Sequence, residues 1–105
     1  DPTSVERIRS GGSVFHDTLA KELETYPRFI EYGQTSPHDP LAVATLINPD
    51  LVTSQPVNAI VDLSQQSSRG AIHFSNNAEG TIQLVNDVDS TSFKSLLLSR
   101  IETPL

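Results

Sequence analysis

Residues 38–49 read HDPLAVATLINP, and the rest of the chain can be interpreted outward from this stretch. An aspartate followed by a proline favours the start of a helix, with Asp39 as the N-cap and Pro40 at the first helical position. The apolar body Leu41–Ile47 follows, and an Asn-Pro dipeptide ends it. Because this short helix is apolar almost all round, we expect it to be buried against other elements.

The residues before this stretch also have helical spacing. The chain opens with a second Asp-Pro pair, and Val5 and Ile8 provide a short apolar stripe behind it. A Ser-Gly-Gly-Ser sequence at 10–13 interrupts the pattern. A helix is then predicted over 14–25, and Pro27 ends it. A further short turn precedes a loop rich in Gly, Ser and Pro.

The second half of the chain changes from helical to alternating periodicity. Residues 57–63 alternate as a strand with one buried face, and 70–74 and 81–85 read as two further strands separated by polar turns. Asp89 then begins a last helix, whose apolar face runs over 93–101. The predicted fold class is α/β: helices, then a three-strand meander, then a closing helix.

Length and charge limit the classes of partner. The 105 residues are 36% hydrophobic and contain no linker, so 1–105 is expected to form a single domain. Thirteen acidic and seven basic side chains give a net charge of −6, and the basic residues are scattered. Binding to a nucleic-acid polymer or to anionic lipid is therefore excluded. The longest apolar run is far shorter than the roughly 20 residues of a membrane span.

Three residue types are absent from the composition: Cys, Met and Trp. The lack of Cys excludes disulfides, thiolate nucleophiles and Cys-ligated metals. Since the chain lacks Met and opens with Asp1, we expect it to be processed or excised from something longer. No signal or transmembrane segment is seen, so a cytoplasmic location is expected.

One of the three histidines has a context that suggests chemistry. His16 and His73 lie within regular helical and strand patterns and are interpreted as ordinary packed or surface residues. His38 lies in a loop that ends at a helix N-terminus, where functional residues are common. With Asp39 it offers a titratable imidazole and an oxygen ligand for a hard cation. The alternative is that Asp39 is only a helix cap and His38 an exposed loop residue.

The residues that follow His38 and Asp39 extend this pair into a longer sequence motif. The sequence HDPLAVA at 38–44, followed by INPDLVT at 47–53, resembles the C-terminal motif of the nucleoside hydrolases, the inosine/uridine-preferring nucleoside N-ribohydrolase family. VNAIVDL at 57–63 resembles the strand that follows in that family, and 88–101 resembles its terminal helix. The resemblance covers 35–101. It implies the C-terminal fragment of a nucleoside hydrolase-type open α/β fold.

The resemblance implies a reaction and roles for four residues. The family hydrolyses the N-glycosidic bond of ribonucleosides to free base and ribose, with a calcium ion held mainly by aspartates. Carried over, His38 is the general-acid candidate and Asp39 the calcium-ligand candidate. Tyr26 and Tyr32 fall where the family has aromatic residues lining the base pocket. The alternative for the tyrosines is an amphipathic, partly buried structural role.

The chain departs from the family in one respect. The N-terminal Asp-x-Asp-x-x-x-Asp-Asp cluster is absent, so 1–105 is expected to be a single partial domain whose aspartate-cluster half is missing. The isolated chain is expected to be inactive, and the completed enzyme to be a homo-oligomer. A non-catalytic fragment with a binding or structural role, or an independent binding module, are the alternatives. An open apolar face beside His38 would favour the enzyme fragment, whereas a closed core with Asp39 far from any cleft would exclude it.

Overall fold

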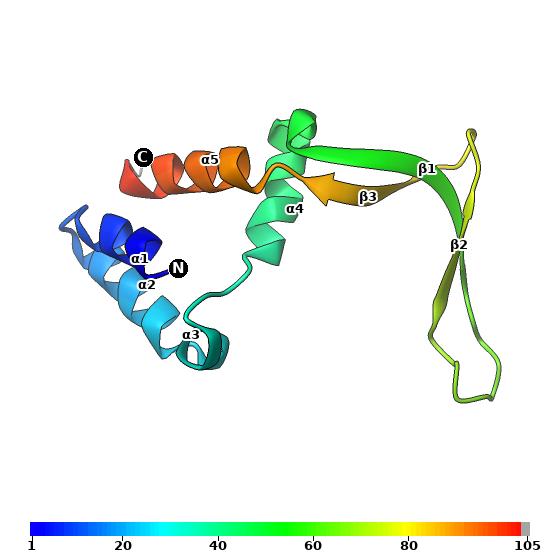
Figure 1. The fold of residues 1–105 in the computed structure, drawn as a ribbon, viewed down its shortest axis with the longest axis horizontal. Helices are drawn as coiled ribbons and strands as arrows, with labels where there is room; N and C mark the ends of the chain where they lie inside the picture. The colour runs from blue at the N-terminus through cyan, green and yellow to red at the C-terminus, as the bar shows by residue number, and fades with distance from the viewer. Residues whose placement is uncertain (104–105) are drawn as a thin grey trace. The chain divides into compact units, whose positions relative to one another are not determined.

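The computed structural model describes residues 1–103, and the chain divides into two compact units (Figure 1). The helical unit comprises Asp1–Pro49 and the C-terminal segment that begins at Ser90, and the sheet unit comprises Asp50–Asp89. The predicted order of helices, three antiparallel strands and a closing helix is confirmed. Among the described residues, no helix is both long enough and apolar enough to cross a membrane.

The first three helices follow the local sequence signals. α1 (Pro2–Arg9) is capped by Asp1, whose Oδ1 accepts hydrogen bonds from the backbone N–H and the hydroxyl of Ser4, each at 3.0 Å. α2 (Val14–Thr25) has the bounds that the apolar spacing predicts. α3 (Pro27–Tyr32) is a full helix of six residues where only a short turn was expected. Proline at its first position explains why it begins where α2 ends.

α4 (His38–Ile47) begins earlier than predicted. Asp39 is not its N-cap: the helix starts at His38, Pro37 occupies the cap position, and no side chain caps it. The Pro37 carbonyl accepts the first helical hydrogen bond from the Leu41 N–H at 3.1 Å, so the cap falls two residues upstream of Asp39. Asp39 lies instead in the first turn, where its negative charge interacts favourably with the helix dipole.

α5 (Ser90–Glu102) closes the helical unit by packing against α1 and α2. The small core of this unit is formed by buried apolar side chains from these three helices: Val5, Ile8, Ala20 and Leu98. Ion pairs at both ends of α1 reinforce its contact with α5. Lys94 pairs with Asp1, and the Arg7 guanidinium donates to both carboxylate oxygens of Glu102 at 2.7 and 3.0 Å.

A 3₁₀ turn, η1 (Pro49–Leu51), begins at the last residue of the first helical segment and leads into the sheet unit. The sheet unit contains β1 (Val52–Val61), β2 (Ile72–Asn76) and β3 (Ile82–Val88). β1 begins five residues before the predicted strand 57–63, and its neighbours also shift. The strand order is β2-β1-β3, all antiparallel. A meander would place the second strand in the middle, so this detail of the prediction is wrong: the first strand is central.

The strand order follows from a crossing at Val57. This residue pairs with Asn76 of β2 and also with Ile82 of β3, so β2 lies along the second half of β1 and β3 along the first half (Figure 1). The connection between them must pass from one edge of β1 to the other. Gly80 lies against the Val57 backbone at the crossing, and Val57 is only 1% exposed.

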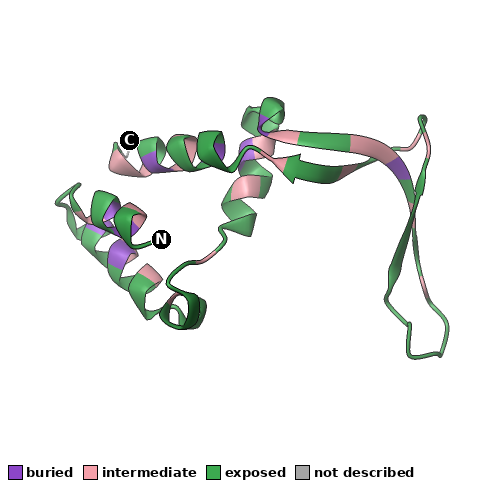
Figure 2. Ribbon diagram, in the orientation of Figure 1, coloured by how far each residue is buried: buried purple, intermediate pink, exposed green. Residues whose placement is uncertain are grey.

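Most of the chain is exposed (Figure 2), and many large apolar side chains are among the exposed residues. The strand face expected to be buried is buried only at Val57, whereas Ile72 and Phe74 are about half exposed. α4 is not buried either, because Ala44 alone is buried within it and Leu46 is 84% exposed. Apolar periodicity shows which face can be buried, but burial also requires an element that covers it.

Candidate functional site

His38 and Asp39 form the first turn of α4. The His38 N–H donates to the Ser36 carbonyl at 3.0 Å, which ties the preceding loop to the helix start. Both residues are exposed. Successive residues of a helix are rotated by about 100°, so the imidazole and the carboxylate leave α4 in different directions. Both groups are therefore accessible to a ligand at this end of α4.

Tyr26 and Tyr32 lie at opposite ends of α3. Tyr26 has an extended backbone, as expected for a residue before proline, and it separates α2 from α3. Tyr32 is the last residue of the helix, and Gly33 follows in the left-handed conformation with φ of 67°. The two rings are 51% and 61% exposed. A hydrogen bond with the Glu31 carboxylate raises the pKa of the Tyr32 hydroxyl above its ordinary value.

The structure brings the four predicted residues together only in pairs. His38 and Asp39 share one helical turn, and the tyrosines share one short helix. A five-residue loop separates the pairs, and no hydrogen bond or ring contact joins them within residues 1–103. The predicted roles of His38, Asp39, Tyr26 and Tyr32 stay predictions at this point.

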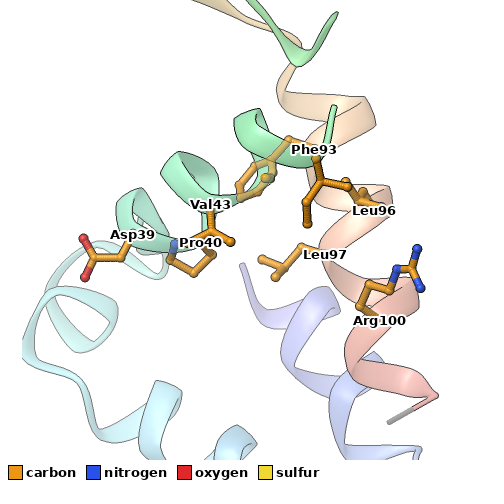
Figure 3. A pocket seen from close by; sticks show the side chains of 9 residues that line it. Asp39, Pro40, Val43, Phe93, Leu96, Leu97 and Arg100 are labelled. Carbon is orange, nitrogen blue, oxygen red and sulfur yellow. The ribbon is translucent and has the colours of Figure 1, made fainter. Parts of the chain in front are cut away.

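Asp39 lies at the edge of an apolar groove between α4 and α5 (Figure 3). The groove has a volume of about 710 Å³. Val43 from α4 and Leu97 from α5 point into it, while the Asp39 carboxylate points away from these side chains. The remaining lining residues are mainly apolar: Pro40, Ala44, Ile47, Phe93 and Leu96, with Arg100 as the basic residue. An open apolar surface therefore adjoins the His38–Asp39 turn.

Sequence reasoning did not predict this groove. The spacing of the α5 residues placed Phe93, Leu97 and Arg100 on one face, which was the available signal. The other wall had no comparable signal, because α4 is apolar all round and its sequence does not mark one face. Arg100 is consequently a candidate binding residue that only the packing of α5 against α4 identifies.

His16 has a structural role. It is 3% exposed, and its Nε2–H donates to the Ile101 carbonyl of α5 at 2.9 Å. Nδ1 is then the acceptor for the Ser13 hydroxyl at 2.7 Å. Gly11 lies against the ring, with no room for a side chain. The interpretation of His16 as an ordinary packed residue is confirmed.

The described residues do not form a metal site by themselves. Within residues 1–103, no group of three or more His, Asp or Glu side chains is arranged to hold an ion. Calcium takes about six to eight oxygen ligands, and the His38–Asp39 turn provides one carboxylate. The donor set in this chain therefore does not fit a calcium ion without further ligands.

The helices and sheet have the fold of part of a nucleoside hydrolase. One of the solved structures that match is the purine-preferring ribonucleoside hydrolase from Gardnerella vaginalis, with a TM-score of 0.75 and 26% sequence identity. The match covers 96% of this chain and 34% of that hydrolase, so this chain spans about a third of the length of the protein it matches. No family model and no curated protein matches the chain. The fold that the resemblance implied is confirmed.

Proposed function

We infer that this chain forms one wall of the active site of a ribonucleoside hydrolase and acts when the rest of that fold is present. The observation that supports this proposal most directly is the position of the His38–Asp39 turn beside an open apolar groove, in a fold that matches such a hydrolase. A closed core with Asp39 far from any cleft would have opposed it. The proposed substrates are ribonucleosides, with purine nucleosides first, as in the name of the matching enzyme.

His38 is the proposed general acid. In the reaction, the bond between ribose C1′ and the base nitrogen breaks, and its electron pair goes to the base. A protonated His38 imidazole donates a proton to a ring nitrogen of the departing base, which makes the base a better leaving group. Water adds to C1′ and loses a proton, so the products are ribose and the neutral base. The exposure of His38 allows a base to reach the imidazole.

Tyr26 and Tyr32 are the proposed base-binding residues, and Asp39 is a proposed calcium ligand. Half-exposed tyrosine rings can stack on a purine while their hydroxyls donate hydrogen bonds. The single proton of the Tyr32 hydroxyl is engaged by the Glu31 carboxylate, so Tyr32 is proposed to contribute chiefly its ring. Since Asp39 is one carboxylate, the other oxygen ligands of a calcium ion must come from residues outside 1–105.

The isolated chain is proposed to be inactive. It spans about a third of the matching hydrolase, and among residues 1–103 no group of three His, Asp or Glu side chains could hold a metal ion. The uncovered apolar side chains of α4, including Val43, Leu46 and Ile47, are consistent with a surface that another part of the fold covers. The second candidate, a non-catalytic binding or structural fragment, has no comparable observation in its favour.

A chimeric enzyme tests the proposal. The third of the Gardnerella vaginalis hydrolase that matches this chain is replaced by residues 1–105, and release of hypoxanthine from inosine is measured with and without added calcium. We expect calcium-dependent hydrolysis by the chimera and none by the 105-residue chain alone. The matched controls are chimeras carrying His38→Ala, Asp39→Asn or His73→Ala, and only the last is expected to retain full activity. A folded chimera without activity, or turnover by the isolated chain, would contradict the proposal.

A further inference from the structure

Arg28 is a basic side chain of α3 in a chain whose net charge is −6. Arg7, Arg9 and Lys94 form ion pairs, and the Arg69 guanidinium donates to two backbone carbonyls. Within residues 1–103, Arg28 is exposed and forms no ion pair. Because arginine is not deprotonated in proteins, α3 carries a permanent positive charge that is free to contact a ligand.

α3 places Arg28 and Tyr32 on one face. The helix stays regular to its end, because the Gly33 N–H donates to the Phe29 carbonyl, four residues back, at 2.8 Å. Side chains four residues apart on an α-helix are about one turn apart and separated by roughly 40° around the axis, so they are neighbours. Phe29 packs against the core of the helical unit, whereas Arg28 and Tyr32 are both exposed. The guanidinium and the phenol ring are therefore presented to solvent side by side.

The two side chains provide different contacts to a planar ligand. The Tyr32 ring is 61% exposed, and its hydroxyl is engaged by the Glu31 carboxylate, so the face of the ring is what remains for a ligand. The Arg28 guanidinium has five N–H donors and no acceptor. Because the arginine side chain is long, these donors can reach the edge of a base that stacks on the ring. The pair therefore favours a base that carries a hydrogen-bond acceptor on that edge.

Purine bases differ at their 6-position in a way that a guanidinium group distinguishes. Guanine and hypoxanthine carry the O6 carbonyl, which accepts hydrogen bonds, whereas adenine carries an amino group that donates them. When the bond between ribose C1′ and the base nitrogen breaks, its electron pair moves onto the base, and part of the negative charge develops on O6. A cationic donor stabilises such a developing charge more strongly than a neutral donor does. One contact to O6 can therefore select the base and assist its departure.

We propose that Arg28 donates to O6 of a 6-oxopurine stacked on Tyr32, and that it thereby selects inosine and guanosine over adenosine. This inference rests on the proposed function. The guanidinium keeps its protons throughout, because the proton that the departing base gains comes from His38 and the electron pair goes to the base. Arg28 therefore adds a specificity-determining contact to the reaction and leaves the acid role unchanged. An exposed arginine that contacts only water would give no dependence on the base.

The chimera that carries residues 1–105 tests this inference by comparing substrates. We measure kcat/KM for inosine, adenosine and p-nitrophenyl riboside, whose leaving group has no O6. Arg28→Ala is expected to lower kcat/KM on inosine about 10–100-fold, the usual loss for a hydrogen bond to a charged group. The change on adenosine and on p-nitrophenyl riboside is expected to be less than about threefold. Arg28→Lys keeps the charge and loses the planar fork, so its effect should be intermediate. Lys21→Gln, at an exposed basic position of α2, is the matched control and should leave all three values unchanged.

Product inhibition provides a second readout that does not depend on the chemical step. Free hypoxanthine is expected to inhibit the Arg28→Ala chimera at least about tenfold more weakly than the unsubstituted chimera, and adenine to inhibit both equally. An active chimera whose preference for inosine over adenosine is unchanged by Arg28→Ala, or equal losses on all three substrates, would overturn this inference and leave the proposed function standing. A folded chimera that is inactive on every nucleoside would overturn both.

Discussion

Gly80 lies directly against the backbone of Val57, where the connection between β2 and β3 crosses the central strand. A Cβ atom on Gly80 would lie 2.6 Å from the carbonyl carbon of Val57 and 2.7 Å from its nitrogen. Both neighbours are backbone atoms of the middle strand, so neither can move without disturbing the pairing on both sides. The path of the chain across the sheet therefore depends on a residue without a side chain.

Gly80→Ala is expected to destabilise the sheet unit by about 1–3 kcal/mol, the usual cost of inserting a methyl group into a filled space. The measurement is urea unfolding followed by circular dichroism. Thr81→Ala, at the exposed neighbouring position, is the matched control and should change the free energy of unfolding by less than about 0.5 kcal/mol. Equal free energies of unfolding for the two variants would show that a Cβ atom can be accommodated between position 80 and the Val57 backbone.

Replacement of His16 by Ala is expected to destabilise the helical unit by about 1–3 kcal/mol, because the partly buried Ile101 carbonyl loses its donor and the Ser13 hydroxyl loses its acceptor. Thermal unfolding measures the effect. His73→Ala removes an exposed histidine and is expected to have little effect. A similar loss for both variants would argue against the linking role of His16.

Glu102 is expected to make stability depend on acid pH. The hydrogen bond from Arg7 holds the pKa of Glu102 below its ordinary value of 4.5. A carboxylate with a lowered folded pKa contributes its stabilisation above the unfolded value, and the contribution disappears as pH falls through the folded value. Glu102→Gln should therefore be less stable than the wild type at pH 7, and the two should converge as the pH falls through the lowered pKa of Glu102.

Denaturant unfolding between pH 3 and 7 measures this difference. Glu22→Gln, at an exposed position of α2 that forms no ion pair among residues 1–103, is the control and should follow the wild-type curve. Because Arg7 and Glu102 are partly exposed, high salt should reduce the difference. Parallel curves for the Glu102 variant and the wild type over the whole range would exclude the ion pair as the cause.

For the completed enzyme, His38→Ala is expected to slow purine nucleosides more than p-nitrophenyl riboside, because an activated leaving group needs less protonation. The loss of kcat/KM on inosine is expected to be about 10²–10⁴-fold. Steady-state kinetics on both substrates provides the comparison, and an exposed-residue variant such as His73→Ala is the control. Equal losses on the two substrates would remove the acid role from His38.

Local signals predicted much of the helical part. The Asp-Pro pair at the start of α1 and the apolar spacing of α2 act over one or two turns, so their bounds could be inferred from neighbouring residues. The same reasoning failed at Asp39, where Pro37 and not the aspartate occupies the cap position. A proline two residues earlier provided a carbonyl in the required place, and residue type alone does not distinguish such alternatives.

One part of the candidate site could be predicted from the sequence, and the other part depends on tertiary packing. The His38–Asp39 motif is contiguous and can be found in the sequence, whereas the groove beside it requires α5 to return from position 90 to lie against α4. Arg100 and Asp39 are 61 residues apart in the chain, and no local pattern predicts that they line one groove. The exposure of Leu46 is also a tertiary property, because it depends on what packs against α4.

Periodicity, caps and the His-Asp-Pro motif were thus enough to indicate the element types, their order and the family of folds, because each depends on neighbouring residues. The central position of β1 and the crossing at Gly80 depend on contacts between residues far apart in the chain. Such contacts are set by packing and backbone pairing in three dimensions. For that reason they appear only once the tertiary structure is known.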